Sequence, residues 1–370
     1  MIRTCLLALL ASAVNAAPCA DARYLEWNNL GVQAHAQGAY GKAAELLTRS
    51  LALAESCFGA GDIWLAAVLS NLAESEVALG RLADAESHAL RAVRITEEAL
   101  GDRDPHTAKR LSILGYVYTH QGRYREAERS YRFALAIREK QSPLSSPERV
   151  ATLNNLGECL LLQRRYDQAL AVVRDALALG EASAGADQAD LAPVLNTLAR
   201  IHLARAEWDP AGSALERSLA IHERQHGPRH PAPAAVRNNL GALALSRKRY
   251  SDAERWFRTA LEIFEEVYGR EHPETAKAMN NLGDALGAKG HHRDAESLLR
   301  ESLAICERTL PASHPQTLQI ALNYSRLLRQ GGKRTEAAKI EKRLGEAIRA
   351  RTRAEPTEGA TVDLRDLKRR

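Results

Sequence analysis

The sequence predicts an all-α protein, an α-α superhelix or solenoid of about eight helix-turn-helix repeats. Aromatic residues make up only 5% of the 370-residue chain, and few aromatics with many Ala and Leu favour helix over sheet. An Ala stands thirteen residues after each copy of a recurring Leu position, in all eight copies. The Leu is followed by a small residue and recurs with a constant 42-residue period, at Leu30, Leu72, Leu114, Leu156, Leu198, Leu240 and Leu282, with Tyr324 in a degenerate eighth copy. A fixed period of this length is typical of solenoids.

Composition and charge exclude several classes of protein. The 51 basic and 46 acidic residues give a formal net charge of +5, too small an excess to indicate a nucleic-acid partner or a polybasic membrane contact. The five cysteines include no CxxC pair, so neither a disulfide-dense scaffold nor a zinc finger is indicated. The chain has no G-x-x-x-x-G-K-[ST] or G-x-S-x-G motif, and no cofactor is predicted.

The segment 1–16 has the order of a secretory signal peptide. Arg3 supplies a positive charge, residues 5–14 form an apolar run, and Val14-Asn15-Ala16 places small residues where a signal peptidase cuts. A ten-residue helix is about 15 Å long, half the thickness of the membrane hydrocarbon core, so no membrane span is expected. We predict cleavage after Ala16 and a secreted or periplasmic protein; the alternative is an apolar N-terminus of a cytosolic one.

Export would leave four cysteines in an oxidising compartment: Cys19, Cys57, Cys159 and Cys306. Cys19 precedes the first expected helix and Cys57 ends the second, and antiparallel helices bring those two ends together. A Cys19–Cys57 disulfide is therefore one hypothesis. The alternative is that all four cysteines are small buried hydrophobic residues.

One repeat, residues 273–308, shows how the pattern forms a helix pair. Met279, Leu282 and Leu286 lie at i, i+3 and i+7, on one face of a helix. Gly290 ends that helix, because glycine adopts the left-handed conformation past a helix C-terminus without strain. We interpret the recurring Ala of the second helix, and the small residue after the Leu, as places where two helix backbones approach closely.

Each repeat begins with a helix-start signal. Proline suits the first helical turn and recurs in the same 42-residue register, at Pro105, Pro147, Pro231, Pro273 and Pro315. The preceding residue is Asp104 or Ser146 in two copies, both good N-caps, and His230, His272 or His314 in the other three. Successive histidines in this register would lie about 10 Å apart, too far to share a zinc ion at about 2.0–2.1 Å per ligand. We interpret them as helix-start residues and predict no metal site.

These residues resemble the tetratricopeptide repeat, in the 42-residue form of kinesin light chains. The likeness is carried by segments such as Asn280-Asn281-Leu282-Gly283, Ala295-Glu296 and Gly269-Arg270-Glu271-His272-Pro273, and it extends over about residues 21–350. It implies stacked helix pairs in a right-handed superhelix, with the first helices lining the concave side. It leaves the function open, because such repeats serve many partners.

Asparagines recur just before the Leu position, beside the apolar stripe of the first helix. The candidate ligand-binding residues are Asn29, Asn71, Asn155, Asn239, Asn281 and Asn323, with Asn154, Asn238 and Asn280 one residue earlier. One interpretation is a ladder of hydrogen bonds between repeats, each contributing about 0.5–1.5 kcal/mol. The other is an array of donors and acceptors that faces an extended peptide, since the Asn before Leu contacts bound peptide in the resembling family. The two interpretations are compatible, and both stay open.

The position two residues after the Leu is also expected on the concave wall, and it carries charges of both signs. Glu74, Glu158, Arg200 and Arg326 are examples. A row of mixed sign does not predict a clamp for a C-terminal carboxylate. It indicates a partner with both charges and some apolar anchors.

One motif resembles a catalytic site. His222-Glu223-Arg224-Gln225-His226 matches the H-E-x-x-H of zinc metallohydrolases, in which two His bind zinc and Glu activates water. The repeat register argues against this function, because Glu223 aligns with an acidic position of other repeats: Glu97, Glu139, Glu265 and Glu307.

The predicted organisation is a signal peptide (1–16), a solenoid (17–350) and a flexible C-terminal tail (351–370), with the last helix from Ala338 to about Arg353. The predicted function is non-catalytic: an exported scaffold that binds an extended protein or peptide segment on its Asn-lined concave surface. One alternative is a structural assembly subunit that uses its convex face or edges, and a remote one is the metallohydrolase. The sequence does not identify the partner or the oligomeric state.

Overall fold

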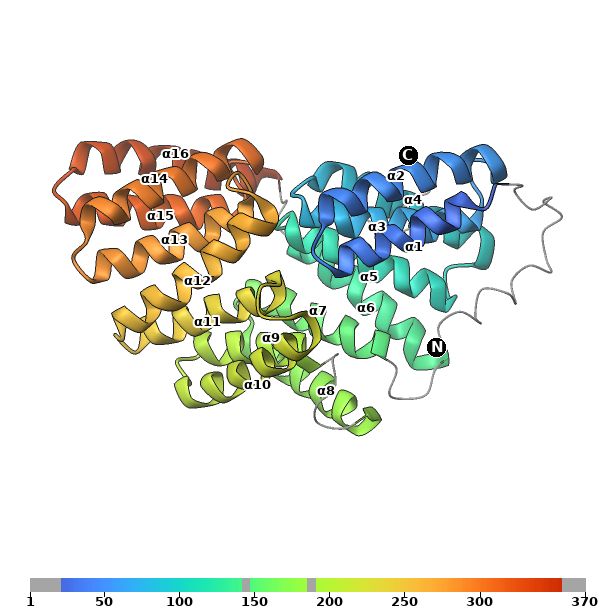
Figure 1. The fold of residues 1–370 in the computed structure, drawn as a ribbon, viewed down its shortest axis with the longest axis horizontal. Helices are drawn as coiled ribbons and strands as arrows, with labels where there is room; N and C mark the ends of the chain where they lie inside the picture. The colour runs from blue at the N-terminus through green and yellow to red at the C-terminus, as the bar shows by residue number, and fades with distance from the viewer. Residues whose placement is uncertain (1–20, 142–146, 185–190, 355–370) are drawn as a thin grey trace.

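The computed structural model describes residues 21–141, 147–184 and 191–354, and these ranges contain sixteen α-helices and no strand. Figure 1 shows them stacked as antiparallel pairs along a curved path. Repeats 1 to 4 are α1 (Arg23–Ala36) with α2 (Tyr40–Phe58), α3 (Ile63–Ala78) with α4 (Leu82–Leu100), α5 (Pro105–His120) with α6 (Tyr124–Gln141), and α7 (Pro147–Leu162) with α8 (Tyr166–Ala184). Repeats 5 to 8 are α9 (Leu191–Ala204) with α10 (Trp208–His226), α11 (Pro231–Ser246) with α12 (Tyr250–Tyr268), α13 (Pro273–Ala288) with α14 (His292–Thr309), and α15 (Pro315–Gln330) with α16 (Arg334–Ala354). The predicted all-α solenoid is confirmed.

The core runs along the solenoid between neighbouring helices. Each helix packs on its neighbours in chain order, and each first helix also packs on the first helix of the next repeat. The recurring alanines are all fully buried, at 0% exposure: Ala43, Ala85, Ala127, Ala169, Ala211, Ala253, Ala295 and Ala337. A Cβ added to Gly115 would lie 2.8 Å from the Tyr131 ring, and one added to Gly241 would lie 2.5 Å from Phe257. The predicted close approach of the two helices in a repeat is therefore confirmed.

The turn inside each repeat requires a left-handed residue. Glycine supplies it in repeats 1, 2, 3, 7 and 8, where φ lies between 73° and 88°, at Gly38, Gly80, Gly122, Gly290 and Gly332. Repeats 4 to 6 hold the same conformation with other residues, at Arg164 (φ 61°), Ala206 (φ 59°) and Lys248 (φ 60°). The left-handed region costs a residue with a Cβ about 1–2 kcal/mol, so the middle repeats carry strain that the outer ones avoid.

The predicted N-caps are present at the described helix starts. The side chain of Asp104 accepts a hydrogen bond from the backbone N–H two residues later. His230, His272 and His314 do the same through Nδ1, at 3.1, 3.1 and 3.2 Å. Ser146 lies outside the described residues.

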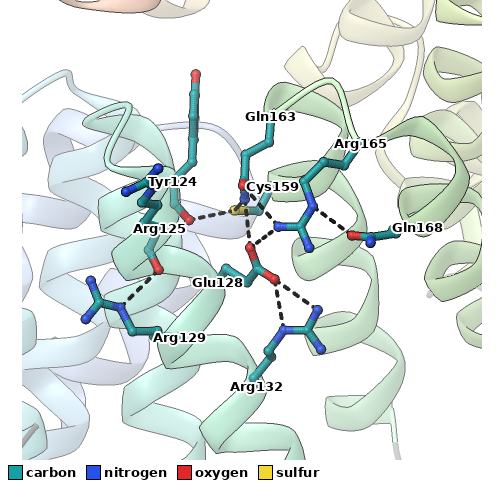
Figure 2. A network of polar contacts seen from close by, with 9 residues as sticks. All are labelled: Tyr124, Arg125, Glu128, Arg129, Arg132, Cys159, Gln163, Arg165 and Gln168. Atoms are coloured by element: carbon teal, nitrogen blue, oxygen red, sulfur yellow. Dashed lines mark hydrogen bonds and ion pairs between the residues drawn. The ribbon is translucent and has the colours of Figure 1, made fainter. Parts of the chain in front are cut away.

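Ion pairs join successive repeats on the side of the turns, and Figure 2 shows one of these junctions. Arg165 of repeat 4 contacts Glu128 of repeat 3, with 2.5 Å between Nη1 and Oε2, and Gln163 donates to the same carboxylate. Burial raises the pKa of Glu128, but hydrogen bonds from Gln163, Arg165 and Arg132 outweigh it and hold that pKa below its usual range. Similar pairs join other neighbouring repeats, such as Arg123 with Glu86 and Lys333 with Glu296.

The path curves back on itself. Figure 1 shows repeats 1–3 (the N-terminal arm, blue to teal) beside repeats 6–8 (the C-terminal arm, yellow to red), with repeats 4 and 5 connecting them. Hydrogen bonds and a ring stack join the two arms. We call this contact the seam, formed by residues 36–40, 78–82 and 120–122 of one arm and residues 230–231, 268–273 and 314–315 of the other.

Several predictions about the ends of the chain lie outside the described residues. These are the signal peptide (1–16), Cys19 and the tail beyond residue 354. Helix α16 continues to Ala354, so the first four residues of the predicted tail are helical. Cys57 is disulfide-bonded, whereas Cys159 and Cys306 are free and buried; the Cys19–Cys57 pairing stays a prediction. None of the helices in the described ranges combines the length and the hydrophobicity that a membrane crossing needs.

Candidate ligand-binding groove

The inner side of the curved solenoid forms a partly open cavity of about 350 Å³. The first helix of every repeat (α1, α3, α5, α7, α9, α11, α13 and α15) contributes residues to its lining. The starts of α2 and α4 and the end of α12 also contribute. Tyr116, Glu158 and Arg200 line it from the position two residues after the Leu. The expectation that first helices line the concave side is therefore confirmed, and we call this space the groove cavity.

Three tyrosines provide flat apolar surfaces in the groove cavity. The rings of Tyr40 and Tyr268 are stacked with centroids 5.6 Å apart, and Tyr268 stacks in turn on His272 at 4.4 Å. Tyr116 lies edge-on to the ring of His120, at 4.5 Å. Burial raises the pKa of Tyr116 and of Tyr268, so both hydroxyls stay protonated and can donate hydrogen bonds.

Charged groups of both signs also face the groove cavity. Arg200 on α9 donates to Glu158 on α7, with 2.5 Å between Nη1 and Oε1, and Lys277 contacts Glu274 within α13 at 3.1 Å. Burial opposes ionisation of Glu274, but Lys277 and the nearby His120 lower the pKa of that carboxyl to about 2. Burial also opposes ionisation of Glu158, but Arg200 holds the pKa of that carboxyl below its usual range, so both carboxylates are charged at neutral pH. The cavity offers paired charges, which suits a ligand of mixed rather than single sign.

The predicted asparagines form bonds between repeats. The Nδ2 of the Asn before Leu donates to the Oδ1 of an Asn in the preceding repeat, at 2.8 to 3.1 Å. The donor–acceptor pairs are Asn71 to Asn28, Asn239 to Asn196, Asn281 to Asn238, and Asn323 to Asn280. The ladder between repeats is thus present.

The same asparagines differ in their access to the groove cavity. Asn238 and Asn239 line it, together with Asn196. The remaining seven candidates (Asn29, Asn71, Asn154, Asn155, Asn280, Asn281 and Asn323) are not among its lining residues. A ligand-binding role for all nine stays a prediction, and the cavity favours Asn238 and Asn239.

The sequence did not predict the seam. There, His272 and His314 each use one ring nitrogen to cap a helix and the other to contact the opposite arm. His272 Nδ1 accepts the capping N–H, so Nε2 carries the proton and donates to the carbonyl of Ala78 at 2.6 Å. His314 donates in the same way to the carbonyl of His120, also at 2.6 Å. His230 faces the backbone of Ala36, but its buried Nε2 makes no hydrogen bond. The two members of each pair are 194 residues apart in the chain, so the three contacts form equally spaced rungs.

Each rung also places a proline against a turn glycine. A Cβ added to Gly38, Gly80 or Gly122 would lie 3.3, 3.4 or 2.7 Å from Pro231, Pro273 or Pro315, respectively. Leu82 packs against the hydrophobic cores of both arms. The turns of one arm therefore fit closely against the helix starts of the other.

The H-E-x-x-H residues are used in packing. Glu223 is paired with Arg237, with 2.5 Å between Oε1 and Nη2, and the ring of His226 stacks on His230 at 4.4 Å. His222 is buried, and its Nδ1 has no hydrogen-bond partner. Within the described ranges, no three His, Cys, Asp or Glu side chains are placed to hold one metal ion. The described geometry therefore gives the metallohydrolase alternative no support.

A curved stack of eight helix pairs around an inner groove defines an α-helical repeat protein. The family model for the tetratricopeptide repeat matches residues 25–95, 64–140, 148–221, 204–266 and 234–308, which together make up more than half of the chain. The chain belongs to the tetratricopeptide repeat family. Proteins of this family are typically non-catalytic scaffolds that bind protein or peptide partners.

Three solved structures are similar in fold. A Rap protein complexed with competence and sporulation factor aligns with a TM-score of 0.59 and 16% identity, over 89% of this chain and 97% of that one. BtubC (BKLC) from P. vanneervenii aligns with a TM-score of 0.48 and 23% identity, over 62% of this chain and 91% of that one. A putative kinesin light chain from Podosopora anserina with nearly identical TPR-like repeats aligns with a TM-score of 0.43 and 20% identity, over 57% of this chain and 99% of that one. A search of curated protein sequences gives no match to this chain.

Proposed function

We propose that this protein is a non-catalytic scaffold that works outside the cytoplasm and holds an extended segment of a protein or peptide partner in its groove cavity. The observation that carries this proposal is the convergence of all eight repeats on one partly open space. The lining of this space combines amide, aromatic and charged side chains, whereas an assembly subunit would use its convex face or edges.

The lining supplies the contacts that an extended segment needs. Asn238 and Asn239 are amides that can bond to a peptide backbone, whose N–H and C=O groups alternate along an extended chain. Tyr116 and Tyr268 supply apolar surface with a donor at the end. Lys277, which is 48% exposed, remains accessible to a carboxylate of the partner. Backbone bonds would give affinity, and the charged and aromatic wall would select the sequence.

Two further observations support the proposal. The Rap protein that shares this fold was crystallised with a bound factor, competence and sporulation factor. The order of the segment 1–16 is that of an export signal, and the disulfide at Cys57 suits an oxidising compartment.

Peptide selection tests the binding function directly. We would immobilise residues 17–370, select from a random library of twelve-residue peptides, and measure affinities of the selected peptides by fluorescence anisotropy. Lys277→Gln and Tyr116→Ala should weaken binding at least tenfold. Lys109→Gln is the matched control, because Lys109 occupies the same register four repeats earlier and does not line the cavity.

The alternative, an assembly subunit that uses its convex face, predicts the opposite pattern. Arg258 on α12 is 54% exposed and does not line the groove cavity. If Arg258→Gln abolished partner binding while Lys277→Gln and Tyr116→Ala left it unchanged, the groove proposal would be overturned.

Export has its own test. Protein recovered from the periplasm or medium of an exporting host should give an N-terminal sequence that starts at Ala17. A chain that keeps Met1 and stays in the cytoplasm would contradict this part of the proposal without affecting the groove.

A further inference from the structure

We propose that the seam is a clasp: the two arms separate to admit the partner segment and then close over it, so that the groove works as a gated channel. This inference rests on the proposed function of the groove cavity. It adds the opening and closing of the two arms. It also gives Nε2 of the helix-start histidines a role, which is to hold the arms together.

The first argument is the regularity of the seam. Three successive turns of one arm meet three successive helix starts of the other, at a constant separation of 194 residues. At each rung, a His faces a backbone carbonyl and a Pro lies against a turn Gly, with 2.7 to 3.4 Å between the Pro ring and the position of a Cβ on that Gly. Three rungs in register mean that two stretches of solenoid run side by side over three repeats, and the contact is not a single crossing point.

The second argument is that the seam is thin compared with the interfaces inside each arm. In the described part of the chain, helices pack closely only on helices of their own or the adjacent repeat. The seam consists of turns and helix starts: two His–carbonyl hydrogen bonds, the Tyr40–Tyr268 stack, three Pro–Gly contacts and Leu82. A solenoid depends on contacts between neighbours for its stability, so the arms can part without unfolding a repeat.

The third argument is that the seam forms part of the cavity wall. Tyr40, Leu82, Tyr268 and His272 line the groove cavity and also join the arms. A ligand in the cavity therefore touches residues from both sides of the seam. Because a ligand that contacts both arms binds the closed form better than the open form, binding and closure must be thermodynamically coupled.

The chain suggests a variant that removes the clasp and keeps the helix caps. Asn is as good an N-cap as Asp, and Asp104 shows that a short side chain caps this position in repeat 3. Replacing His230, His272 and His314 with Asn should therefore preserve each cap, whereas the Asn side chain is too short to reach the opposite carbonyl. Asn is preferred to Asp because it adds no charge beside Glu274.

Pulsed electron paramagnetic resonance would measure the closure without any ligand. Arg81 and Glu271 are exposed residues on opposite sides of the middle rung and can carry spin labels through R81C and E271C. The parent should show one short distance, and the triple Asn variant should show a population at least 10 Å longer with an unchanged melting temperature. A long distance already in the parent, or no change in the triple variant, would overturn the clasp.

A cross-link then tests the gate. Joining R81C to E271C with a short bismaleimide should slow the association of a selected twelve-residue peptide at least tenfold, and should slow its dissociation when it is added after binding. Unchanged rates would overturn the gating role. If no peptide is selected at all, the proposed groove function fails, whereas the label distance still decides whether the clasp exists.

Discussion

The interior of the repeats and the seam between the arms use different positions of the same 42-residue unit. The interior depends on constant positions: the recurring Ala is fully buried in all eight repeats. The seam joins recurring turn glycines to recurring helix-start His-Pro pairs from distant repeats, and it adds variable residues such as the first residue of the second helix, Tyr40 in repeat 1 and Leu82 in repeat 2. The buried Ala thus sets how the two helices of a repeat pack, the turns and helix starts form the contact between the arms, and the variable positions determine which side chains the groove presents.

The largest expected effect concerns a histidine in the interior. Burial, and then the neighbouring His226 and His230, lower the pKa of His222 to about 4. Since this lies below the ordinary value of about 6.5, the unfolded chain binds the proton first as pH falls. Stability is therefore complete above about pH 6.5 and is lost progressively down to about pH 4, by about 3 kcal/mol.

His222→Leu should remove that loss. Urea unfolding at pH 7 and pH 4 would measure it, with His292→Leu as the control because His292 is exposed on α14. The difference in stability between the two pH values should shrink by about 3 kcal/mol only in His222→Leu. Equal pH dependence in both variants would show that the interior tolerates a charge at this place.

The next effect tests the close approach of two helices. Ala295 is fully buried, and its carbonyl oxygen lies 3.4 Å from the position of a Cβ on Gly283. Ala295→Leu should overpack this contact and lower the free energy of unfolding by about 1–3 kcal/mol. Ala288→Leu, on the exposed side of the same repeat, should change it by less than about 0.5 kcal/mol. Both are read by urea denaturation, and similar effects would mean that the constant Ala is not a packing requirement.

The interior could be predicted from the sequence because every feature of it recurs. Ala295 is buried for the same reason as seven other alanines, and Gly290 ends its helix like four other glycines. The seam could not be predicted, since its partners are 194 residues apart and meet only through the summed curvature of several repeats. The repeat register predicted that His272 starts a helix, and its Nδ1 does cap α13. Nothing in the register indicated that Nε2 of the same ring would contact Ala78.

The candidate groove lies between these two cases. The repeat register placed Tyr116, Glu158 and Arg200 on the concave wall, and they line the cavity. The same register could not separate asparagines that face the cavity from those that mainly join repeats. Asn239 does both: it donates to Asn196 and lines the cavity. Whether an asparagine lines the cavity depends on how the solenoid curves around it, and the repeat register does not specify that curvature.

Ala substitutions at two glycines distinguish a contact across the seam from strain within a repeat. Gly122 and Gly332 both have a positive φ, 76° and 79°, so Ala at either position should lower the free energy of unfolding by about 0.5–1 kcal/mol, which is the backbone strain less the flexibility that glycine gives the unfolded chain. A Cβ on Gly122 would also lie 2.7 Å from Pro315 across the seam, whereas one on Gly332 meets nothing within 4 Å. Both variants should therefore lose similar stability, but only Gly122→Ala should enlarge the molecule in small-angle X-ray scattering. Equal dimensions for the two variants would indicate that the arms do not meet at this rung in solution.

The smallest effect is a gain in stability in the middle repeats. Ala206 holds a left-handed conformation with φ 59° at the turn where five other repeats have glycine. Ala206→Gly should raise the free energy of unfolding by about 0.5–1 kcal/mol, because the relief of the strained Cβ exceeds the extra flexibility that glycine gives the unfolded chain. The reverse change at an equivalent turn, Gly290→Ala, should lower it by a similar amount, since its Cβ would meet nothing within 4 Å and only the backbone strain remains. Urea denaturation of the two variants should therefore give shifts of opposite sign. A loss in Ala206→Gly would mean that this residue does more than turn the chain, and that repeats 4 to 6 follow a different rule from the five repeats that have glycine at this turn.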